Sequence, residues 1–414
     1  MILSPPIPFG TDLGCAYARM YGFRPVARTE HDALRFPLGA WIPRRPGSRE
    51  RHRVLGYALG PGGEPSYVLA RHDGRLALRR AAGANERYGA SEERDPSLAR
   101  RLVDAEGRPA WISGPAEASG LAIYFLHGWE TPGPDLLLLP EAVERGLAVV
   151  HETGDVQSLL LEVCSNVTVL GLSGDLLKGG QQDRVLAVDV VAAPDAEPTE
   201  VPVYCVEANR WHPRAGDPTK HFAEAERSAP PDLKRKLVRG TSQVEVWEQV
   251  SHLQESLGAS LGRGEALRDQ RSLSSLRLAL DDAELEARVD ALCRDLLPLP
   301  EDAALPVLGH AVAVNGVLRQ AELFATADLH RRSWPRLLRS AVLDALLAGA
   351  EEGASPPPVE AVARWVEDAF AGDRERREEP TPYGRRVRTR SRSVCALQTF
   401  QPEERLVHLL ASAA

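Results

Sequence analysis

The sequence predicts an α+β protein in which a mostly antiparallel β-sheet or sandwich is packed by helices, with an additional N-terminal β-rich module. Three observations support this fold class. Short runs rich in Val, Ile and Leu, separated by turn residues, fill the first half of the chain, as is typical of strands. Apolar residues recur at helical spacing from about residue 240 onward. Hairpin signals are interleaved with these helical segments.

Residues 1–115 form the predicted β-rich module, whose role the sequence does not indicate. The segment YVLARHDGRLALRR has two alternating runs around Asp73 and Gly74, a pair that suits a hairpin turn with positive φ. The run RVLGYAL before GPGGEP is a further predicted strand. Residues 113–120, SGPAEASG, are small and polar and favour a boundary. We therefore expect a second domain at residues 120–414.

The second domain begins with predicted strands and one short helix. The helix is LPEAVERGL at residues 139–147. The strands are enriched in β-branched residues, and they are LAIYFLH (121–127), LAVVHE (147–152), LLLEVCS (159–165), VTVLGL (167–172), VLAVDVV (185–191) and EVPVYCV (200–206).

Helices are predicted to dominate after Trp211. Ser242 and Glu245 have the spacing of a capping box, which opens a helix. Its predicted inward residues are Val244, Trp247, Val250 and Leu257. A further helix has Leu285, Val289, Leu292 and Leu296 at helical spacing.

The last quarter of the chain combines helices and hairpins. Pro335 is placed at the start of a predicted helix, and SPPPVEAVARWVEDAF opens another after a proline-rich break. Asn315 and Gly316 predict a two-residue hairpin turn. The closing runs SVCALQTF and LVHLLAS are expected to pair.

Composition excludes several classes of protein. The 414 residues carry a formal net charge of -8, which argues against nonspecific nucleic-acid binding by the whole surface. The five cysteines are scattered without a C-x-x-C pair, so we expect a reducing cytoplasm. No apolar run is long enough to cross a membrane. Metal-site, serine-hydrolase and Rossmann motifs are absent from the sequence. Oligomeric state and partner proteins are not indicated.

The segment GDLLKGGQQDRVL, residues 174–186, is the first candidate site. Two glycines let the backbone approach a ligand, cations suit phosphate, and amides suit sugar hydroxyls or a base edge. The predicted ligand-binding residues are Lys178, Gly179, Gly180, Gln182 and Arg184, with Asp175 as a candidate catalytic acid or base. The alternative is a solvated β-turn with polar decoration.

The second candidate site is CVEANRWHPR, which follows a predicted strand. Arg210 and Trp211 suit charge pairing and stacking with a ligand, and Glu207 is the second candidate catalytic carboxylate. Alternatively, Trp211 covers the core and Glu207 pairs with an arginine. We expect Cys205 to be a small buried residue and not a nucleophile.

The third candidate is RVRTRSRS, in which arginines alternate at Arg386, Arg388, Arg390 and Arg392. An extended segment places all four on one face. Such a face suits phosphate groups of nucleic acid, and it equally suits a solvated edge strand that is protected from pairing by its charge.

These segments, taken in order, resemble the ARG and rhodanese-phosphatase-superfamily-associated protein domain family. The resemblance covers residues 120–414. The family loop runs G-E-E-L-x-G-A-K-Q-N-R, and Asp175, Gln182 and Arg184 stand at its first glutamate, glutamine and arginine. Leu176 stands at its second glutamate. The family motif C-V-E-x-G-R-W is matched by Cys205, Val206, Glu207, Arg210 and Trp211.

The resemblance implies a role around NAD or ADP-ribose derivatives, because the family is associated with ADP-ribosylglycohydrolases and phosphatases. Our leading hypothesis is a protein that binds, and in one version processes, such a nucleotide; no further cofactor is implied. Whether it is an enzyme stays open, because Leu176 removes one of the two family carboxylates. The alternatives are a noncatalytic interaction module, with Glu207 bridging Arg184 in an internal hydrogen-bond network, and nucleic-acid contact through residues 386–392.

Overall fold

A computed structural model of the chain describes residues 24–25, 41–43, 51–61, 64–70, 76–80, 101–103, 109–128, 135–194, 197–208, 210, 221–270, 272–302 and 307–414. The chain divides into two compact units. The smaller comprises Met1–Pro115, Tyr124–Trp129 and Pro298–Val307, and the larger comprises Ala116–Ile123, Glu130–Leu297 and Leu308–Ala414.

The division falls within β7 (Pro109–Ala118) and β8 (Leu121–His127). The stretch 113–120, for which the sequence favours a boundary, is therefore the end of a strand and the turn after it. β8 is buried along its whole length, as its apolar sequence predicts.

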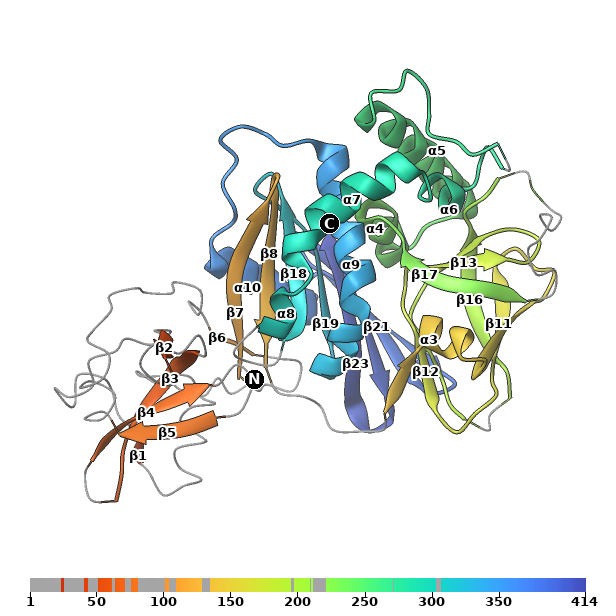
Figure 1. The fold of residues 1–414 in the computed structure, drawn as a ribbon. Helices are drawn as coiled ribbons and strands as arrows, with labels where there is room; N and C mark the ends of the chain where they lie inside the picture. The colour runs from red at the N-terminus through yellow and green to blue at the C-terminus, as the bar shows by residue number, and fades with distance from the viewer. Residues whose placement is uncertain are drawn as a thin grey trace. The chain divides into compact units, whose positions relative to one another are not determined.

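The smaller unit contains a five-stranded antiparallel sheet in the order β1-β3-β4-β5, with β2 paired to β3 (Figure 1). Its strands are β1 (Arg24–Pro25), β2 (Trp41–Pro43), β3 (Arg51–Leu59), β4 (Pro65–Ala70) and β5 (Leu76–Arg80). Tyr67 of β4 lies opposite Arg79 of β5, which confirms the predicted pair of strands. Asp73 and Gly74 lie outside the described residues. β6 (Arg101–Val103) pairs with β7.

The larger unit is built on long antiparallel strands in the order β20-β21-β22-β23-β19-β18. They are β18 (Val307–Val314), β19 (Val317–Phe324), β20 (Glu375–Thr381), β21 (Gly384–Arg390), β22 (Val394–Gln401) and β23 (Arg405–Ala413). β22 and β23 are the predicted closing pair. Between β18 and β19, Asn315 and Gly316 both have positive φ, at 48° and 78°, as the predicted two-residue turn requires.

Two smaller sheets complete the strands of this unit. A six-stranded antiparallel sheet has the order β10-β11-β16-β14-β13-β17, and a three-stranded sheet has the order β15-β12-β9. Their strands are β9 (Leu136–Leu138), β10 (Ala148–Glu152), β11 (Ser158–Val163), β12 (Thr168–Gly171), β13 (Asp175–Gly179), β14 (Arg184–Leu186), β15 (Val190–Ala192), β16 (Thr199–Cys205) and β17 (Phe222–Ser228).

The single strand predicted at 185–191 is two strands. β14 pairs with β16, whereas β15 pairs with β12 in the other sheet. Residues 187–189 pass between the sheets, and the apolar run continues through them because both strands are buried. Leu159, Val169, Leu186 and Val203 belong to the core between these sheets.

The described helices are α3 (Leu139–Glu144), α4 (Pro231–Arg239), α5 (Gln243–Ser260), α6 (Leu276–Ala279), α7 (Ala283–Leu296), α8 (Leu299–Asp302), α9 (Ala327–Ala348) and α10 (Val359–Ala371). α9 contacts β19 and β17, while α4 and α10 contact β22. α3, α7 and α10 confirm helices predicted from the sequence. The fold is thus α+β, with large antiparallel sheets and helices packed on them (Figure 1).

α5 confirms its capping box, because the Ser242 hydroxyl accepts from the Glu245 amide at 3.3 Å and the Glu245 carboxylate accepts from the Ser242 amide at 2.8 Å. Its buried face differs from the prediction. Val244 is 60% exposed, and Val246 points inward in its place. A helix that starts at Gln243 with Val250, Leu253 and Leu257 inward turns Val244 to the solvent.

Pro335 does not start a helix. It lies inside α9, which begins at Ala327, with the Thr326 hydroxyl accepting from the Leu329 amide at 3.2 Å. A proline in a helix interior removes one backbone hydrogen bond and clashes with the preceding turn. The buried face of α9, which includes Leu329, Leu337 and Val342, outweighs this cost.

Candidate functional site

Residues 174–186 fold as a β-hairpin and not, as predicted, as a connection between two strands. β13 pairs antiparallel with β14, with Leu177 opposite Arg184. β17 and β16 extend the sheet on either side of this hairpin. The apolar pair Leu176–Leu177 is too short for its periodicity to distinguish a strand from a loop. Tertiary pairing therefore determines its conformation.

Gly180 is required by close packing at the hairpin turn. Its φ is +56°, and a Cβ there would lie 2.6 Å from Glu152 Oε2 and 2.8 Å from Phe222 Cζ. The Gln181 backbone amide donates to the same Glu152 oxygen at 3.1 Å. Gly179 also has a positive φ, of 128°. The glycine pair is thus explained by the turn and its neighbours.

The structure brings the two polar motifs together. The Gln182 amide nitrogen donates to the Glu207 carbonyl at 2.9 Å, and the Asp183 backbone amide donates to Glu207 Oε2 at 3.2 Å. Arg184 lies opposite Cys205 in the sheet register. These contacts join segments more than twenty residues apart into one polar cluster.

This cluster is an internal network and not an open hollow. Arg184 and Glu207 are 0% exposed, Gln182 is 4% exposed and Arg210 is 6% exposed. Glu207 pairs with Arg210 at 2.7 Å, not with Arg184 as the module hypothesis expects. Arg184 lies 3.8 Å from Glu152 and donates to the Gln182 carbonyl at 3.0 Å. Removal of one partner from such a buried pair would leave the other charge uncompensated.

Helical residues close the cluster from the other side. The Ser275 hydroxyl donates to Asp183 Oδ2 at 2.9 Å and also accepts from the first turn of α6. Gln243 at the start of α5 exchanges two hydrogen bonds of 2.8 Å with the backbone of Cys205. Burial raises the pKa of the Cys205 thiol, which suits the structural role that we expect for it.

Lys178 and Trp211 are the two remaining predicted ligand residues. Lys178 is half-buried on β13. Trp211 lies outside the described residues, so nothing is added to its predicted stacking role.

Asp175 has partners different from those of Glu207. Its Oδ2 accepts from the Leu172 amide at 2.9 Å, and its Oδ1 pairs with Arg336 of α9. Burial raises the pKa of Asp175, and the Arg336 guanidinium opposes that rise. The two candidate catalytic carboxylates therefore belong to separate networks. Arg336, the partner of Asp175, lines a cavity that the sequence does not indicate.

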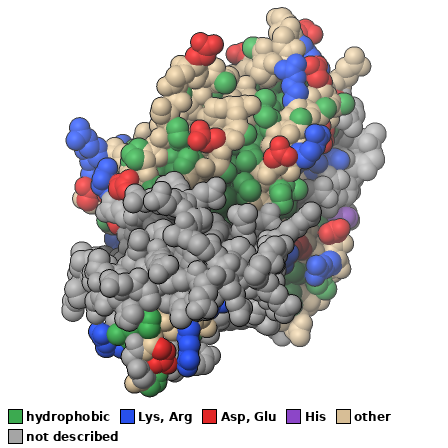
Figure 2. All heavy atoms as spheres, turned by 60° about the vertical axis from the view of Figure 1, so that its left-hand side comes forward, with side chains coloured by type: hydrophobic (Ala, Val, Ile, Leu, Met, Phe, Trp, Pro, Cys, Tyr) green, Lys and Arg blue, Asp and Glu red, His purple; other side chains and the backbone are tan. Residues whose placement is uncertain are grey.

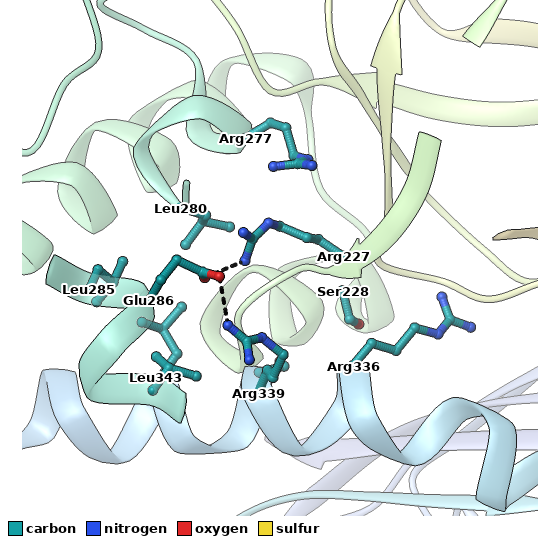
Figure 3. Close-up of a pocket in the computed structure, with 11 residues that line it drawn as sticks. Arg227, Ser228, Arg277, Leu280, Leu285, Glu286, Arg336, Arg339 and Leu343 are labelled. Atoms are coloured by element: carbon teal, nitrogen blue, oxygen red, sulfur yellow. Dashed lines mark hydrogen bonds and ion pairs between the residues drawn. The ribbon is translucent and has the colours of Figure 1, made fainter. Parts of the chain in front are cut away.

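That cavity, of about 230 Å³, is lined by four arginines from two helices and one strand (Figure 3). They are Arg227 of β17, Arg277 of α6, and Arg336 and Arg339 of α9. We call it the arginine pocket. Leu280, Leu285, Val289 and Leu343 supply apolar walls. Glu286 of α7 is its lining carboxylate.

Glu286 bridges two of these cations. Its Oε1 lies 2.8 Å from Arg227 Nη1, and its Oε2 lies 2.8 Å from Arg339 Nη2 (Figure 3). Arg227 also pairs with Asp281 at 2.7 Å, and Arg339 also pairs with Asp290. Two guanidinium groups thus bind the two oxygens of one carboxylate. Arginines commonly bind carboxylate and phosphate groups through such charge-assisted hydrogen bonds.

Arg336 and Ser228 leave donors unused beside the same cavity. Arg336 is 8% exposed, and only its Nη1 reaches Asp175. Within the part of the chain that the structure describes, Arg336 Nε, Arg336 Nη2 and Ser228 Oγ are buried without a hydrogen-bond partner. Buried donors without partners are uncommon in folded proteins. Beside a cavity, these donors are placed where an acceptor-rich ligand could use them.

A second buried ionic network lies beside the start of the hairpin, where the Lys234 side chain packs against Gly174. Lys234 pairs with Glu322 at 2.7 Å, and His408 lies between Glu322, at 3.3 Å, and Asp189, at 2.8 Å. Burial lowers the pKa of His408, but the two carboxylates outweigh burial and raise it to about 9. This network joins α4, β19, β23 and the loop before β15. Because its four side chains are buried and pair with one another, we assign it a structural role.

The four alternating arginines do not form one open face. The Arg386 guanidinium is buried and donates to the Asp189 carbonyl at 3.2 Å, and Arg388 donates to the Leu237 and Val238 carbonyls at the end of α4. Arg390 and Arg392 are exposed. β21 is also not an edge strand, because β20 covers it. On the face drawn in Figure 2, acidic and basic side chains of the described residues lie side by side.

Among the described helices, none combines the length and the apolar character that a membrane span requires. Within the described residues, no group of three or more His, Cys, Asp or Glu side chains is arranged to hold a metal ion.

A model of the ARG and Rhodanese-Phosphatase-superfamily-associated Protein domain matches residues 111–412. The chain belongs to this family. The match confirms the resemblance inferred from the two motifs, and it includes both motifs and the arginine pocket. Searches of curated proteins and of solved structures found no match. The smaller unit lies mostly outside the part that matches this family.

Sequence reasoning missed the residues of the arginine pocket. Arg227, Arg277 and Arg336 lie in three separate segments, none of which has a motif spacing. One signal was available: Arg336 and Arg339 are three residues apart on one helix, so they share a face. That signal is weak in a chain with so many arginines.

Proposed function

We propose that this protein binds a small phosphate-bearing ligand in the arginine pocket. The observation that supports this most directly is the set of unused donors on Arg336 and Ser228. A phosphoryl group offers three acceptor oxygens and negative charge, which would satisfy a guanidinium edge and a hydroxyl together. The apolar walls at Leu280 and Leu343 suit the non-phosphate part of such a ligand.

The size of the cavity limits what it encloses. About 230 Å³ is below the range of about 300–1,000 Å³ typical of pockets that bury a drug-sized ligand. A phosphorylated end therefore fits inside, with the remainder of a larger ligand outside. We propose an NAD- or ADP-ribose-derived nucleotide as the ligand class, on the family name alone. The proposal concerns binding in the cytoplasm and names no reaction.

A second candidate function concerns the two polar motifs themselves. The burial of Arg184, Glu207 and Gln182 supports an internal network in a noncatalytic module, with Gly180 serving the turn. Under this proposal Lys178, Arg210 and Trp211 do not bind a ligand, and the polar cluster has a structural role. A ligand would bind in the arginine pocket instead. The effect of replacing Arg184 separates this structural role from a ligand role of the motifs.

Calorimetry with inorganic phosphate, AMP, ADP-ribose and NAD tests the first proposal. We expect wild-type protein to bind at least phosphate and one nucleotide at millimolar concentration or below. Arg336→Lys keeps a charge for Asp175 but has no Nε–H and no second fork nitrogen, so phosphate affinity should fall about tenfold, or 1.4 kcal/mol. Ser228→Ala should weaken it by a smaller factor.

Arg376→Lys, on the exposed strand β20, is the matched control and should leave affinity unchanged. Circular dichroism verifies that each variant is folded. Absence of binding in folded wild-type protein, or equal affinity in Arg336→Lys, contradicts the proposal.

A further inference from the structure

Glu286 occupies a place that a ligand anion would otherwise take. Its two carboxylate oxygens each lie 2.8 Å from a guanidinium nitrogen, one on Arg227 and one on Arg339. A phosphoryl group bound between two arginines would make the same two contacts. The carboxylate comes from α7, whereas the arginines come from β17 and α9, so a side chain from a third element fills the gap between them (Figure 3).

A second position in the same cavity is left open by contrast. Arg336 lies three residues before Arg339 on α9, so their side chains leave neighbouring points of one helix face. Arg336 Nε and Nη2 and Ser228 Oγ have no hydrogen-bond partner among the described residues. The cavity thus contains two anion positions side by side, of which Glu286 fills one.

We infer that Glu286 sets the ligand class: the wild-type arginine pocket accepts one phosphoryl group, at Arg336 and Ser228, and rejects a second at Arg227 and Arg339. The inference rests on the proposed function and deepens it. A diphosphate would have to displace Glu286, whose side chain is half-buried, from both of its guanidinium partners, and the loss of these two contacts costs free energy. A phosphomonoester makes no such demand. Within the nucleotide class proposed above, the wild-type pocket therefore selects a nucleoside monophosphate such as AMP over the intact diphosphates ADP-ribose and NAD.

Glu286→Gln tests this, with phosphate and pyrophosphate as the two probes in calorimetry. The amide is nearly isosteric but uncharged, so it no longer competes for both guanidinium groups. We expect pyrophosphate affinity to rise about tenfold, or 1.4 kcal/mol, and phosphate affinity to change by less than threefold. Wild-type protein should prefer phosphate or bind the two equally.

Two further variants keep the test decisive. Glu284→Gln removes a neighbouring α7 carboxylate that pairs with Arg263 and Arg288 outside the pocket, and it should not change either affinity. Glu286→Asp keeps the charge but is too short to reach both arginines as Glu286 does. We therefore expect it to gain pyrophosphate affinity by a smaller factor than Glu286→Gln. This variant tests the inference if Glu286→Gln fails to fold.

The outcomes separate the inference from the proposed function. If wild-type protein binds phosphate and Arg336→Lys weakens it, but neither Glu286 variant gains pyrophosphate affinity, the role of Glu286 is wrong and the phosphate pocket stands. If wild-type protein binds neither probe while Glu286→Gln binds pyrophosphate, the subsite is supported and the wild-type function is not. Absence of binding in all variants overturns both.

Discussion

Arg184 is the residue at which the two candidate roles of the polar motifs differ most. Its side chain is 0% exposed, with partners at Glu152 and Gln182. A guanidinium that contacts a ligand must be reachable from the ligand side, whereas a structural guanidinium must only keep its internal partners. Removal of one member of a buried ion pair leaves the other charge uncompensated. Stability and ligand affinity therefore respond differently in the two cases.

Arg184→Met keeps the side-chain length and removes the charge. We expect it to reduce the free energy of unfolding by about 3 kcal/mol, measured by urea denaturation, and to leave phosphate affinity unchanged in the fraction that folds. Arg392→Met, at an exposed position, should change stability by no more than about 0.5 kcal/mol. A stable Arg184→Met protein that has lost phosphate binding would instead support a ligand role for the hairpin.

At the scale of elements, α9 is the helix that supplies two of the four arginines of the arginine pocket. It carries both Arg336 and Arg339, and its N-terminal cap at Thr326 is satisfied. Its interior contains Pro335, whose missing N–H leaves the Arg331 carbonyl without its intrahelical bond. Pro335 is exposed, so its ring contributes little to the core. The helix therefore tolerates an unfavourable residue next to an arginine of the pocket.

Pro335→Ala should stabilise the protein. The alanine restores the hydrogen bond and relieves the clash, and about 1 kcal/mol of this gain is offset by the greater entropy of the unfolded chain. We expect a net increase of about 1 kcal/mol or more in the free energy of unfolding by urea. Pro335→Gly restores the same N–H with poorer helix propensity, so its gain should be smaller. A loss of stability in Pro335→Ala would show that the proline fits α9 without strain.

For the whole molecule, two buried histidines make stability depend on pH in opposite directions. The pKa of His408 is about 9 because Asp189 and Glu322 outweigh burial. The pKa of His310 is about 4 because burial outweighs Glu322. His408 binds its proton more tightly in the folded state, so its stabilisation is complete below about pH 6.5 and is lost as pH rises through 9. His310 must stay neutral, so its effect destabilises the fold as pH falls from 6.5 to 4.

We therefore expect the melting temperature to be highest near pH 6.5 and to fall on both sides. The alkaline loss attributable to His408 is on the order of 3 kcal/mol between pH 6.5 and 9. His408→Asn should lower stability at pH 6.5 and flatten the alkaline limb, while His310→Asn should flatten the acid limb. Thermal unfolding from pH 4 to 10 measures both, and an alkaline limb of unchanged slope in His408→Asn would contradict the assignment.

Much of the fold could be predicted at this scale because the signals are local. The capping box at Ser242, the hairpin at Asn315 and Gly316, and the buried run of β8 each determine their own conformation. Val244 and Pro335 were assigned wrongly because packing against the rest of the protein, not local preference, sets the orientation of α5 and the start of α9.

The candidate site could be predicted only in part. Glu207 and Gln182 meet in the structure, so the two motifs are in contact, as the internal-network alternative implies. Burial of that contact, and the convergence of Arg227, Arg277 and Arg336 on a cavity, depend on three-dimensional packing of distant segments. Single side chains on separate helices and strands leave no spacing in the sequence from which such a cavity can be inferred.

The ion pair between Asp175 and Arg336 has a practical consequence for genetics. One member lies on the hairpin that carries the family motif, and the other faces the cavity. A screen scored only by phenotype would group substitutions at both ends of this pair as loss of function. Pairing each hit with a measurement of protein abundance would separate alleles that break this buried pair and deplete the protein from alleles that leave the protein abundant and alter only the cavity.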